Sequence, residues 1–532
     1  MTRNSIILLL IILALSANAA PAATVLVRFY KHGDLAAVSR EVPDAVPLPV
    51  AAAEALVAGP TPIEIGEGYE TALPLSTKLI KATLDGETLT VDMSSDVLKG
   101  LDDERLWRIG RQFHSTMGDY PGIRSVPLLA KGEPLADFIE VSPSLGEPAP
   151  TEIPKSVGLA GLAGRKIGLG PSHGRYWNGS YWNWQRTDPC GYGEAVLEDT
   201  NSIRLIQLLY QYLTQDGANV LVTREMNEST CCNPYEGLPY WKMGAYSWLR
   251  SQGYPASVWA GSSGVGGEEN VPGVNRYNDD IGCRWRWADY NSTDIYIAHH
   301  TNASGTAGQG SGTELFYDST MTYQAHVANS LSLATNMHNN TLNTIREMYD
   351  STFNNRGVKN SSGAYGEIRR PNRPAVLVEL AFHDYCAKDA LYLTDDFFRS
   401  VAMWGMYKGI CAYFGTTPTY DRYSCDYVSD TIPSTMVEGE SYTVSVTFRN
   451  RGVLWRDAKG FRLGAVDESD PFTSATRHTV TGDVRPGNTC TFTFTMTAPA
   501  AGTYTTDWQM LREGVTWFRS EERRVGKECR SR

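Results

Sequence analysis

Three stretches of the 532-residue chain decide its fold: KIGLGPSHG at residues 166–174, IYIAHHTN at residues 295–302 and PAVLVE at residues 374–379. Each begins as an apolar run of strand length and ends in, or runs into, polar residues. Helical patterns separate these strands from two further β-like runs, at residues 220–223 and 313–317. Strands alternating with helices predict an α/β domain with a mostly parallel sheet, which we place at residues 161–416.

The segments on either side of this domain have different patterns. Between residues 23 and 141, β-like runs flank an Ala-rich helical stretch, which predicts a small α+β domain. The proline-rich residues 142–160 indicate a linker. Within residues 420–518, apolar residues such as Phe492 and Phe494 alternate with Thr, the rhythm of a β-sandwich. The expected fold class is therefore multidomain, α+β, then α/β, then a C-terminal β-sandwich.

Both ends of the chain carry sequence that we do not expect in the folded protein. Residues 1–19 follow the charged, apolar, small-residue order of a secretory signal peptide, and we expect cleavage after Ala19. The alternative is a buried helix. No later stretch reaches about 18 apolar residues, so we expect a secreted or periplasmic protein without a membrane anchor. Residues 519–532 resemble a translated sequencing-library adapter, the alternative being a solvated basic tail.

The overall charge restricts the partner. Lys and Arg number 48 against 59 Asp and Glu, a net charge of −11. An acidic chain is repelled by a phosphate backbone, which excludes nucleic acid as the expected partner. We expect a monomer that binds a neutral or mixed-charge substrate.

Polar side chains stand where α/β enzymes keep their sites, past the carboxyl ends of strands. His173 follows the first strand, His300 follows the third and Glu379 ends the last, while Glu198 precedes a helix. Two imidazoles and a carboxylate are a ligand set for catalytic Zn²⁺, and a further carboxylate can transfer protons. Each residue alone is more often a packing or capping residue, so only the ordered set indicates a metal hydrolase.

Five motifs occur in a fixed order along this domain: GPSHG after a strand, a Glu followed nineteen residues later by Gly and then VLVTR, a strand ending in His-x-Asn, GTELFY, and RPAVLVELAF. Together they resemble the zinc-dependent N-acetylmuramoyl-L-alanine amidases of the AmiC and LytC type. The resemblance implies a bacterial enzyme that cuts peptidoglycan between the lactyl group of MurNAc and L-alanine. It implies zinc as the cofactor, bound by His173, Glu198 and His300, with Glu379 as the general acid/base.

The same resemblance implies substrate-binding positions for Asn302 and Arg284, although Arg284 could equally be an ion-pair partner. The first motif departs from the family's Asp-Pro-Gly-His-Gly. Gly170 and Ser172 replace its Asp and first Gly. Whatever contact that Asp makes in the family is therefore missing here or replaced.

Two of the ligand assignments have neighbouring competitors. His299 precedes His300, but adjacent strand residues point to opposite faces, so one of them faces the metal, and the His-x-Asn spacing favours His300. Glu194 competes with Glu198, and the nineteen-residue spacing to Gly217 favours Glu198.

The flanking domains resemble known modules without catalytic motifs. VRFYKHGDL and EALVAGPTPIE in residues 23–141 resemble the GerMN domain of spore-germination and cell-wall proteins. Residues 420–518 resemble an Ig-like domain of the four-tryptophan kind, in which Trp455 and Trp508 would be core residues.

Between the first motif and His300 the chain is long and aromatic, with eight of its thirteen Trp. We call this segment, between the first motif and His300, the insert. Its aromatic rings either contact sugar and peptide or pack the insert's own core. Export also favours disulfides. We expect one within the insert, from Cys190, Cys283 and one of Cys231 and Cys232, and another between Cys425 and Cys490.

Two other functions are compatible with the sequence. A wall-binding protein that has lost activity is supported by the altered first motif alone. A zinc peptidase or amidase acting on another substrate would keep the metal chemistry and differ in its pocket.

Overall fold

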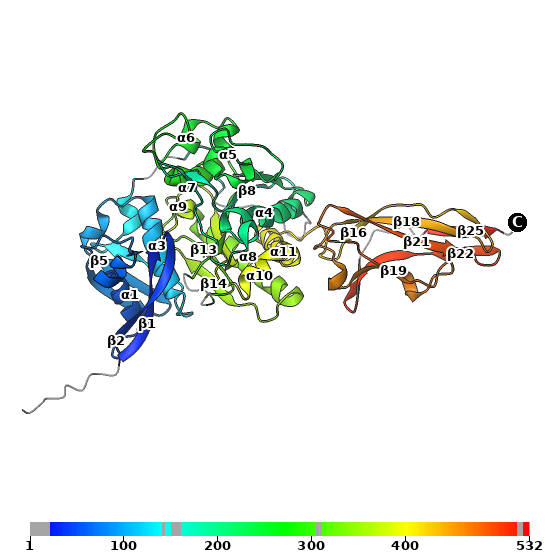
Figure 1. Ribbon diagram of the computed structural model, residues 1–532, viewed down its shortest axis with the longest axis horizontal. Coiled ribbons are helices and arrows are strands. Elements are labelled where there is room, and N and C mark those ends of the chain that lie inside the picture. Colours follow the sequence, from blue (N-terminus) through cyan, green and yellow to red (C-terminus); the bar gives the residue numbers. More distant parts are fainter. Residues whose placement is uncertain are drawn as a thin grey trace, which may run out of the picture.

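The computed structural model describes residues 22–140, 144–150, 161–304, 308 and 310–518, and the backbone of 525–530. The predicted signal peptide and most of the linker lie outside these residues. Figure 1 shows the units in a row, an N-terminal unit, a central unit and a β-rich C-terminal unit. The predicted multidomain fold class is confirmed. No described helix combines the length and apolarity needed to span a membrane.

The central unit is built on a sheet that, within the described residues, has six strands in the order β11-β8-β12-β15-β13-β14. All neighbouring pairs are parallel except β13 with β15, so the sheet is mostly parallel, as predicted, with one antiparallel pair. The strands are β8 (Lys166–Pro171), β11 (Asn219–Val222), β12 (Ile295–Asn302), β13 (Thr313–Tyr317), β14 (Asn355–Asn360) and β15 (Ala375–Phe382).

Helices cover both faces of this sheet, because its strands are apolar on both sides. One face packs on α4 (Glu198–Gln215), α8 (Val327–Met348) and α11 (Asp396–Phe414). The other packs on α5 (Ala245–Ser251), α6 (Ala256–Trp259), α7 (Tyr277–Tyr290) and α9 (Gly366–Arg369). Ile295 and Ile297 join the first core, whereas Tyr296 and Ala298 join the second, so β12 alternates between them. His300 continues the Tyr296 side. The remaining short elements are α10 (Asp389–Thr394), β9 (Tyr176–Trp177) and β10 (Trp182–Asn183).

The N-terminal unit contains two small sheets and three helices among its described residues. Its own apolar core is separate from the central cores. The strands are β1 (Ala22–Lys31), β2 (Asp34–Pro43), β3 (Tyr69–Glu70), β4 (Leu79–Asp85), β5 (Thr88–Met93), β6 (Leu128–Ala130) and β7 (Glu133–Pro134), and the helices are α1 (Leu48–Ala58), α2 (Pro62–Gly66) and α3 (Asp103–Met117).

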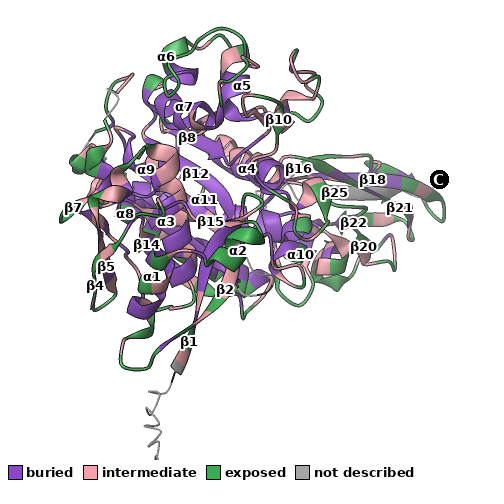
Figure 2. Ribbon diagram, turned by 60° about the vertical axis from the view of Figure 1, so that its left-hand side comes forward, coloured by how far each residue is buried: buried purple, intermediate pink, exposed green. Residues whose placement is uncertain are grey.

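Helix α3 packs against the central unit. Gly110 lies so close to Ala364 that an added Cβ would be 2.1 Å from the Ala364 Cβ, so only glycine allows this approach. Asp103, at the start of α3, forms ion pairs with Arg369 at 2.9 Å and with Arg370 at 2.8 Å. The two units therefore meet through a close, charged and apolar contact. Figure 2 shows mostly buried ribbon where α3 faces the central sheet.

The C-terminal unit has the expected two-residue rhythm. Cys490, Phe492, Phe494 and Met496 are buried on β21, and the Thr residues between them are exposed. Trp455 and Trp508 are also buried. The backbone of 525–530 forms β25, which lies between β17 and β22, within the segment 519–532 that we did not expect in the folded protein. Its strands are β16 (Cys425–Asp430), β17 (Thr435–Val437), β18 (Ser441–Asn450), β19 (Phe461–Ala465), β20 (Arg477–Thr479), β21 (Thr489–Thr497), β22 (Gly502–Thr506), β23 (Trp508–Arg512), β24 (Thr516–Trp517) and β25 (Val525–Arg530).

The cysteine predictions need correction. Cys190 pairs with Cys386, 196 residues away, and not with a cysteine of the insert. Cys283 is buried in α7, where its Sγ donates to the Asp280 carbonyl, and Cys231 is bonded to Cys232. The expected Cys425–Cys490 bond is not among the disulfides of the described residues. Cys190 bonds to Cys386 because the fold brings the segment after β15 beside the loop before α4.

Candidate metal and active site

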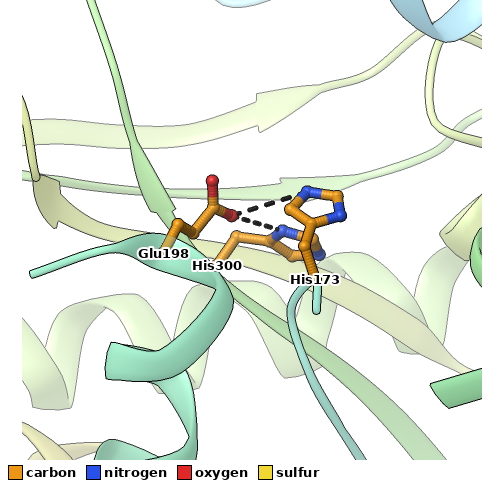
Figure 3. A group of neighbouring side chains, drawn as sticks. All are labelled: His173, Glu198 and His300. Carbon is orange, nitrogen blue, oxygen red and sulfur yellow. Dashed lines mark hydrogen bonds and ion pairs between the residues drawn. The ribbon is translucent and has the colours of Figure 1, made fainter. Parts of the chain in front are cut away.

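Three of the predicted site residues come together beside the central sheet. His173 lies in the turn after β8, Glu198 is the first residue of α4 and His300 is on β12. Because β8 and β12 are parallel neighbours, their carboxyl ends meet at one edge of the sheet. Figure 3 shows the three side chains pointing toward one another.

Their donor atoms converge in a buried space. Glu198 Oε1 lies 2.8 Å from His300 Nδ1 and 3.6 Å from His173 Nε2. The side chains are no more than 6% exposed, and one donor atom from each lies within 4.8 Å of the others. Buried nitrogen and carboxylate donors converging in this way suit a divalent ion. These residues can therefore hold a metal ion.

A guanidinium group faces the same donors. Arg186 Nη2 lies 2.6 Å from His173 Nε2, and Arg186 Nε donates to Glu198 Oε2 at 3.1 Å. Burial, together with Arg186, lowers the pKa of His173 well below its usual value, which keeps the ring neutral, the form that binds metal. Burial alone would raise the pKa of Glu198, but His173, His300 and Arg186 outweigh it and hold that pKa well below its usual range.

Glu379 lies beside the three donors. It is on β15, opposite His300 in the register with β12, and lines the same cavity. Burial, and then the charge of Glu198, raises the pKa of Glu379 to about 8. Glu379 Oε2 is buried and has no hydrogen-bond partner among the described residues. A carboxyl group with a pKa near neutrality can both accept and donate a proton.

Glu367 is a site residue that the sequence did not reveal. Its Oε1 accepts a hydrogen bond from the Tyr296 hydroxyl at 2.6 Å, and its Oε2 accepts one from Arg284 at 3.2 Å. Glu367 Oε2 also lies 3.4 Å from His300 Nε2, the ring nitrogen opposite to the one that faces Glu198. Burial lowers the pKa of His300, but Glu198 and Glu367 outweigh it and raise that pKa to about 9.

Neighbouring side chains compensate for the two altered residues of the first motif, Gly170 and Ser172. A Cβ added to Gly170 would lie 2.1 Å from the Tyr296 hydroxyl and 3.3 Å from Glu367 Oε1, so these two side chains fill the space of the missing Asp side chain. Ser172 adopts a positive φ of 40°, and its hydroxyl donates to Glu198 Oε1 at 2.7 Å. Both departures therefore have local partners.

The two predicted substrate-binding residues differ in position. Asn302 lines the cavity and donates to Glu314 at 2.6 Å. Arg284 is completely buried behind the cavity wall, where it pairs with Asp280 at 2.5 Å and with Glu367. This ion-paired position is the alternative that the sequence left open for Arg284.

The competing residues lie elsewhere. His299 is fully buried on the other face of β12, and burial lowers its pKa to about 3. Glu194 is partly exposed and paired with Lys242, outside the group of converging donors. The tryptophans of the aromatic insert divide equally: four are buried (Trp241, Trp259, Trp285 and Trp287) and four are partly exposed (Trp177, Trp182, Trp184 and Trp248). Trp285 is the insert tryptophan that lines the cavity among the described residues.

A mostly parallel α/β sheet with a His–Glu–His group that can hold a metal ion and an adjacent carboxyl group is the arrangement of a metal-dependent hydrolase. Residues 167–412 match the family model of N-acetylmuramoyl-L-alanine amidases, and residues 29–136 match that of sporulation and spore germination proteins. The central unit is an N-acetylmuramoyl-L-alanine amidase domain, preceded by a GerMN-like domain.

Solved structures of the same class resemble part of the chain. The CwlD amidase of Clostridioides difficile, in complex with the GerS lipoprotein, is 18% identical over 47% of this chain and 98% of its own, with a TM-score of 0.30. Ami1 of Mycobacterium abscessus is 19% identical over 47% and 99%, with a TM-score of 0.30. The tandem GerMN domains of Bacillus subtilis GerM are 19% identical over 21% and 41%, with a TM-score of 0.19. No curated protein matches the chain.

Proposed function

We propose that this protein is an exported, zinc-dependent N-acetylmuramoyl-L-alanine amidase that cuts the bond between the lactyl group of MurNAc and L-alanine in peptidoglycan. His173, Glu198 and His300 are the zinc ligands and Glu379 is the general acid/base. The observation that carries this proposal is the buried convergence of the three donors beside Glu379. The domain's family match supplies the substrate class.

Zinc and Glu379 have separate roles in this reaction. Zinc supplies a Lewis acid that polarises the amide carbonyl and lowers the pKa of water. Glu379 takes a proton from the attacking water molecule. It then gives that proton to the amide nitrogen as the C–N bond breaks, which leaves a carboxyl group on the lactyl side and a free L-alanine amine. Burial, and then the charge of Glu198, raises the pKa of Glu379 to about 8, which suits a carboxyl group that first accepts and then donates a proton.

Product analysis tests this function. Purified peptidoglycan is digested with the wild-type protein and with Glu379→Gln, and new amino termini and glycan fragments are measured. We expect new L-alanine amino termini, intact glycan strands and one zinc ion per chain. Glu379→Gln should retain zinc while its rate falls by about 100- to 10,000-fold. Glu194→Gln is the matched control, because Glu194 is partly exposed and paired with Lys242.

Each contrary result has a distinct meaning. Equal rates for wild type and Glu379→Gln would remove Glu379 from the mechanism. New termini at other peptide bonds would identify a zinc peptidase. A purified protein without zinc that binds peptidoglycan and leaves it intact would identify an inactive wall-binding protein.

A further inference from the structure

The N-terminal unit contributes part of the active-site wall. Asp103, Glu104, Trp107 and Arg111 of α3 line the same cavity as the metal-binding group and Glu379. Their spacing places them along one side of the helix, since residues three or four apart are neighbours on a helix surface. The cavity is therefore formed by two units that the chain separates by a linker.

The position of α3 is determined by its packing. The Gly110–Ala364 contact and the Asp103 ion pairs described above hold the helix against the central unit. His114, one turn beyond Arg111, lies 3.2 Å from the Ser361 carbonyl through its Nε2 and packs against Phe316 and Tyr365. Figure 1 shows α3 on the side of the N-terminal unit that faces α9. Residues on this side of α3 are thus held in place at the cavity.

Trp107 brings a flat ring next to the metal-binding group. Its ring centroid is 6.4 Å from that of His173, and the guanidinium of Arg186 lies 4.8 Å from the ring. The indole therefore limits how far a bound substrate can extend on that side of His173.

Arg111 places a guanidinium group without an ion-pair partner among the described residues at the wall of the cavity. The side chain is partly buried, and its Nη1 is buried with neither a hydrogen-bond partner nor an ion-pair partner among the described residues. Its guanidinium lies 5.4 Å from the Trp107 ring and borders the cavity on both sides of Glu379. An unsatisfied buried donor is costly, and a guanidinium is well suited to bind a carboxylate with two parallel hydrogen bonds. The geometry therefore favours an anionic group of the ligand at this place.

We propose that α3 of the N-terminal unit forms one wall of the substrate-binding cavity, and that Arg111 binds a carboxylate on the peptide side of the scissile amide. This assignment rests on the proposed function, because that function places a peptide in the cavity. Arg111 is a specificity-determining residue supplied by the GerMN-like domain, and the substrate it favours carries a free carboxylate close to the cut bond.

Binding is measured first, with the full chain loaded with zinc and in the Glu379→Gln background, so that the ligand is not consumed. The probes are MurNAc-L-alanyl peptides with free carboxylates and the same peptides converted to primary amides. Arg111→Gln should weaken binding of the carboxylate form by about 10- to 100-fold and leave the amide form nearly unchanged. Arg111→Lys should recover part of the loss. Arg105→Gln is the matched control, the same change on the same helix but away from this cavity.

Turnover then separates this assignment from the proposed function. With Glu379 intact, Arg111→Gln should raise KM for the carboxylate form and leave KM for the amide form nearly unchanged. Because the charge of Arg111 also lowers the pKa of Glu379, its loss should change kcat equally for the two forms. Equal affinity of wild type and Arg111→Gln for the carboxylate form would overturn the assignment, as would faster turnover by Arg111→Gln, which would make α3 an obstruction. Carboxylate-dependent binding without any hydrolysis by the zinc-loaded wild type would instead overturn the amidase function and leave the Arg111 assignment standing.

Discussion

Glu367 occupies the space that Gly170 leaves open and faces the outer nitrogen of His300. In metal sites, a carboxylate beside the second nitrogen of a ligating imidazole holds the ring in orientation and increases its basicity. Glu367 is itself held by Tyr296 and Arg284. At the scale of single residues, this carboxylate is the one that we expect to support the metal ligands from behind.

Replacing Glu367 by Gln should weaken zinc binding by about 10- to 100-fold, because the amide keeps the shape but loses the charge. Competition with a chelating dye measures the affinity directly, without reference to activity. Glu269→Gln is the control, since Glu269 is an equally buried carboxylate in the insert that accepts hydrogen bonds from Ser247 and Asn233. Equal zinc affinities of wild type and Glu367→Gln would contradict this expectation.

The sequence indicated the converging donors because each lies at the end of a recognisable strand or at the start of a recognisable helix, and because the motifs keep a fixed order. Arg186, Glu367 and Arg111 escaped notice for a physical reason. The first two belong to irregular or very short segments, and the third to a helix of another domain. Their places at the site depend on contacts between distant parts of the chain, which leave no local pattern.

Among the elements, the five apolar strands of the central sheet were predicted because burial on both faces demands continuous apolar runs. Strand β14 was missed because its sequence, NRGVKN, has a single large apolar residue, Val358. It pairs with β13 at the edge of the sheet, where a polar strand is tolerated.

The packing of β8 against β12 can be tested at Gly170. Gly170→Ala should lower the free energy of unfolding by about 1 to 3 kcal/mol, because the new methyl group would overlap the Tyr296 hydroxyl. Tyr296→Phe removes that hydroxyl, so the double variant should lose less than the sum of the two single variants. Urea unfolding of all four proteins measures the coupling. Strictly additive losses would show that the two positions do not compete for space.

At the scale of the whole molecule, the domain order was predictable, but the docking of α3 was not. Composition and proline content separate residues 23–141 from the central domain. They carry no information about Gly110 meeting Ala364, which are 254 residues apart in the sequence. A linker predicts that the two domains move independently. The close contact of Gly110 with Ala364 instead packs the N-terminal unit on the central unit, and both units line one cavity.

This docking should weaken in acid. Burial lowers the pKa of His114 to about 4, with Lys359 lowering it further and with the Ser361 carbonyl and Glu314 opposing. An unfolded histidine has a pKa near 6.5, so between these values the unfolded chain binds the extra proton. The contribution of neutral His114 is complete above about pH 6.5 and is lost as the pH falls toward 4, by about 2 kcal/mol at pH 5.

Urea unfolding of wild type and His114→Gln at pH 7.5 and pH 5.0 measures this contribution. Glutamine can still donate to the Ser361 carbonyl but does not titrate, so the difference in stability between the two proteins should shrink or reverse by about 2 kcal/mol at the lower pH. A difference that stays constant between the two pH values would exclude His114 as the titrating group.

The Cys190–Cys386 bond has a practical consequence for making the protein. Cys190 lies eight residues before Glu198, and Cys386 lies seven residues after Glu379, so one covalent link steadies both segments. Thiols stay reduced in the cytosol of ordinary expression hosts. A recombinant sample prepared there would lack the Cys190–Cys386 disulfide. Low activity of such a sample would then reflect the reducing conditions of the host and not the chemistry of the site. Material from an oxidising compartment is the proper starting point for any assay.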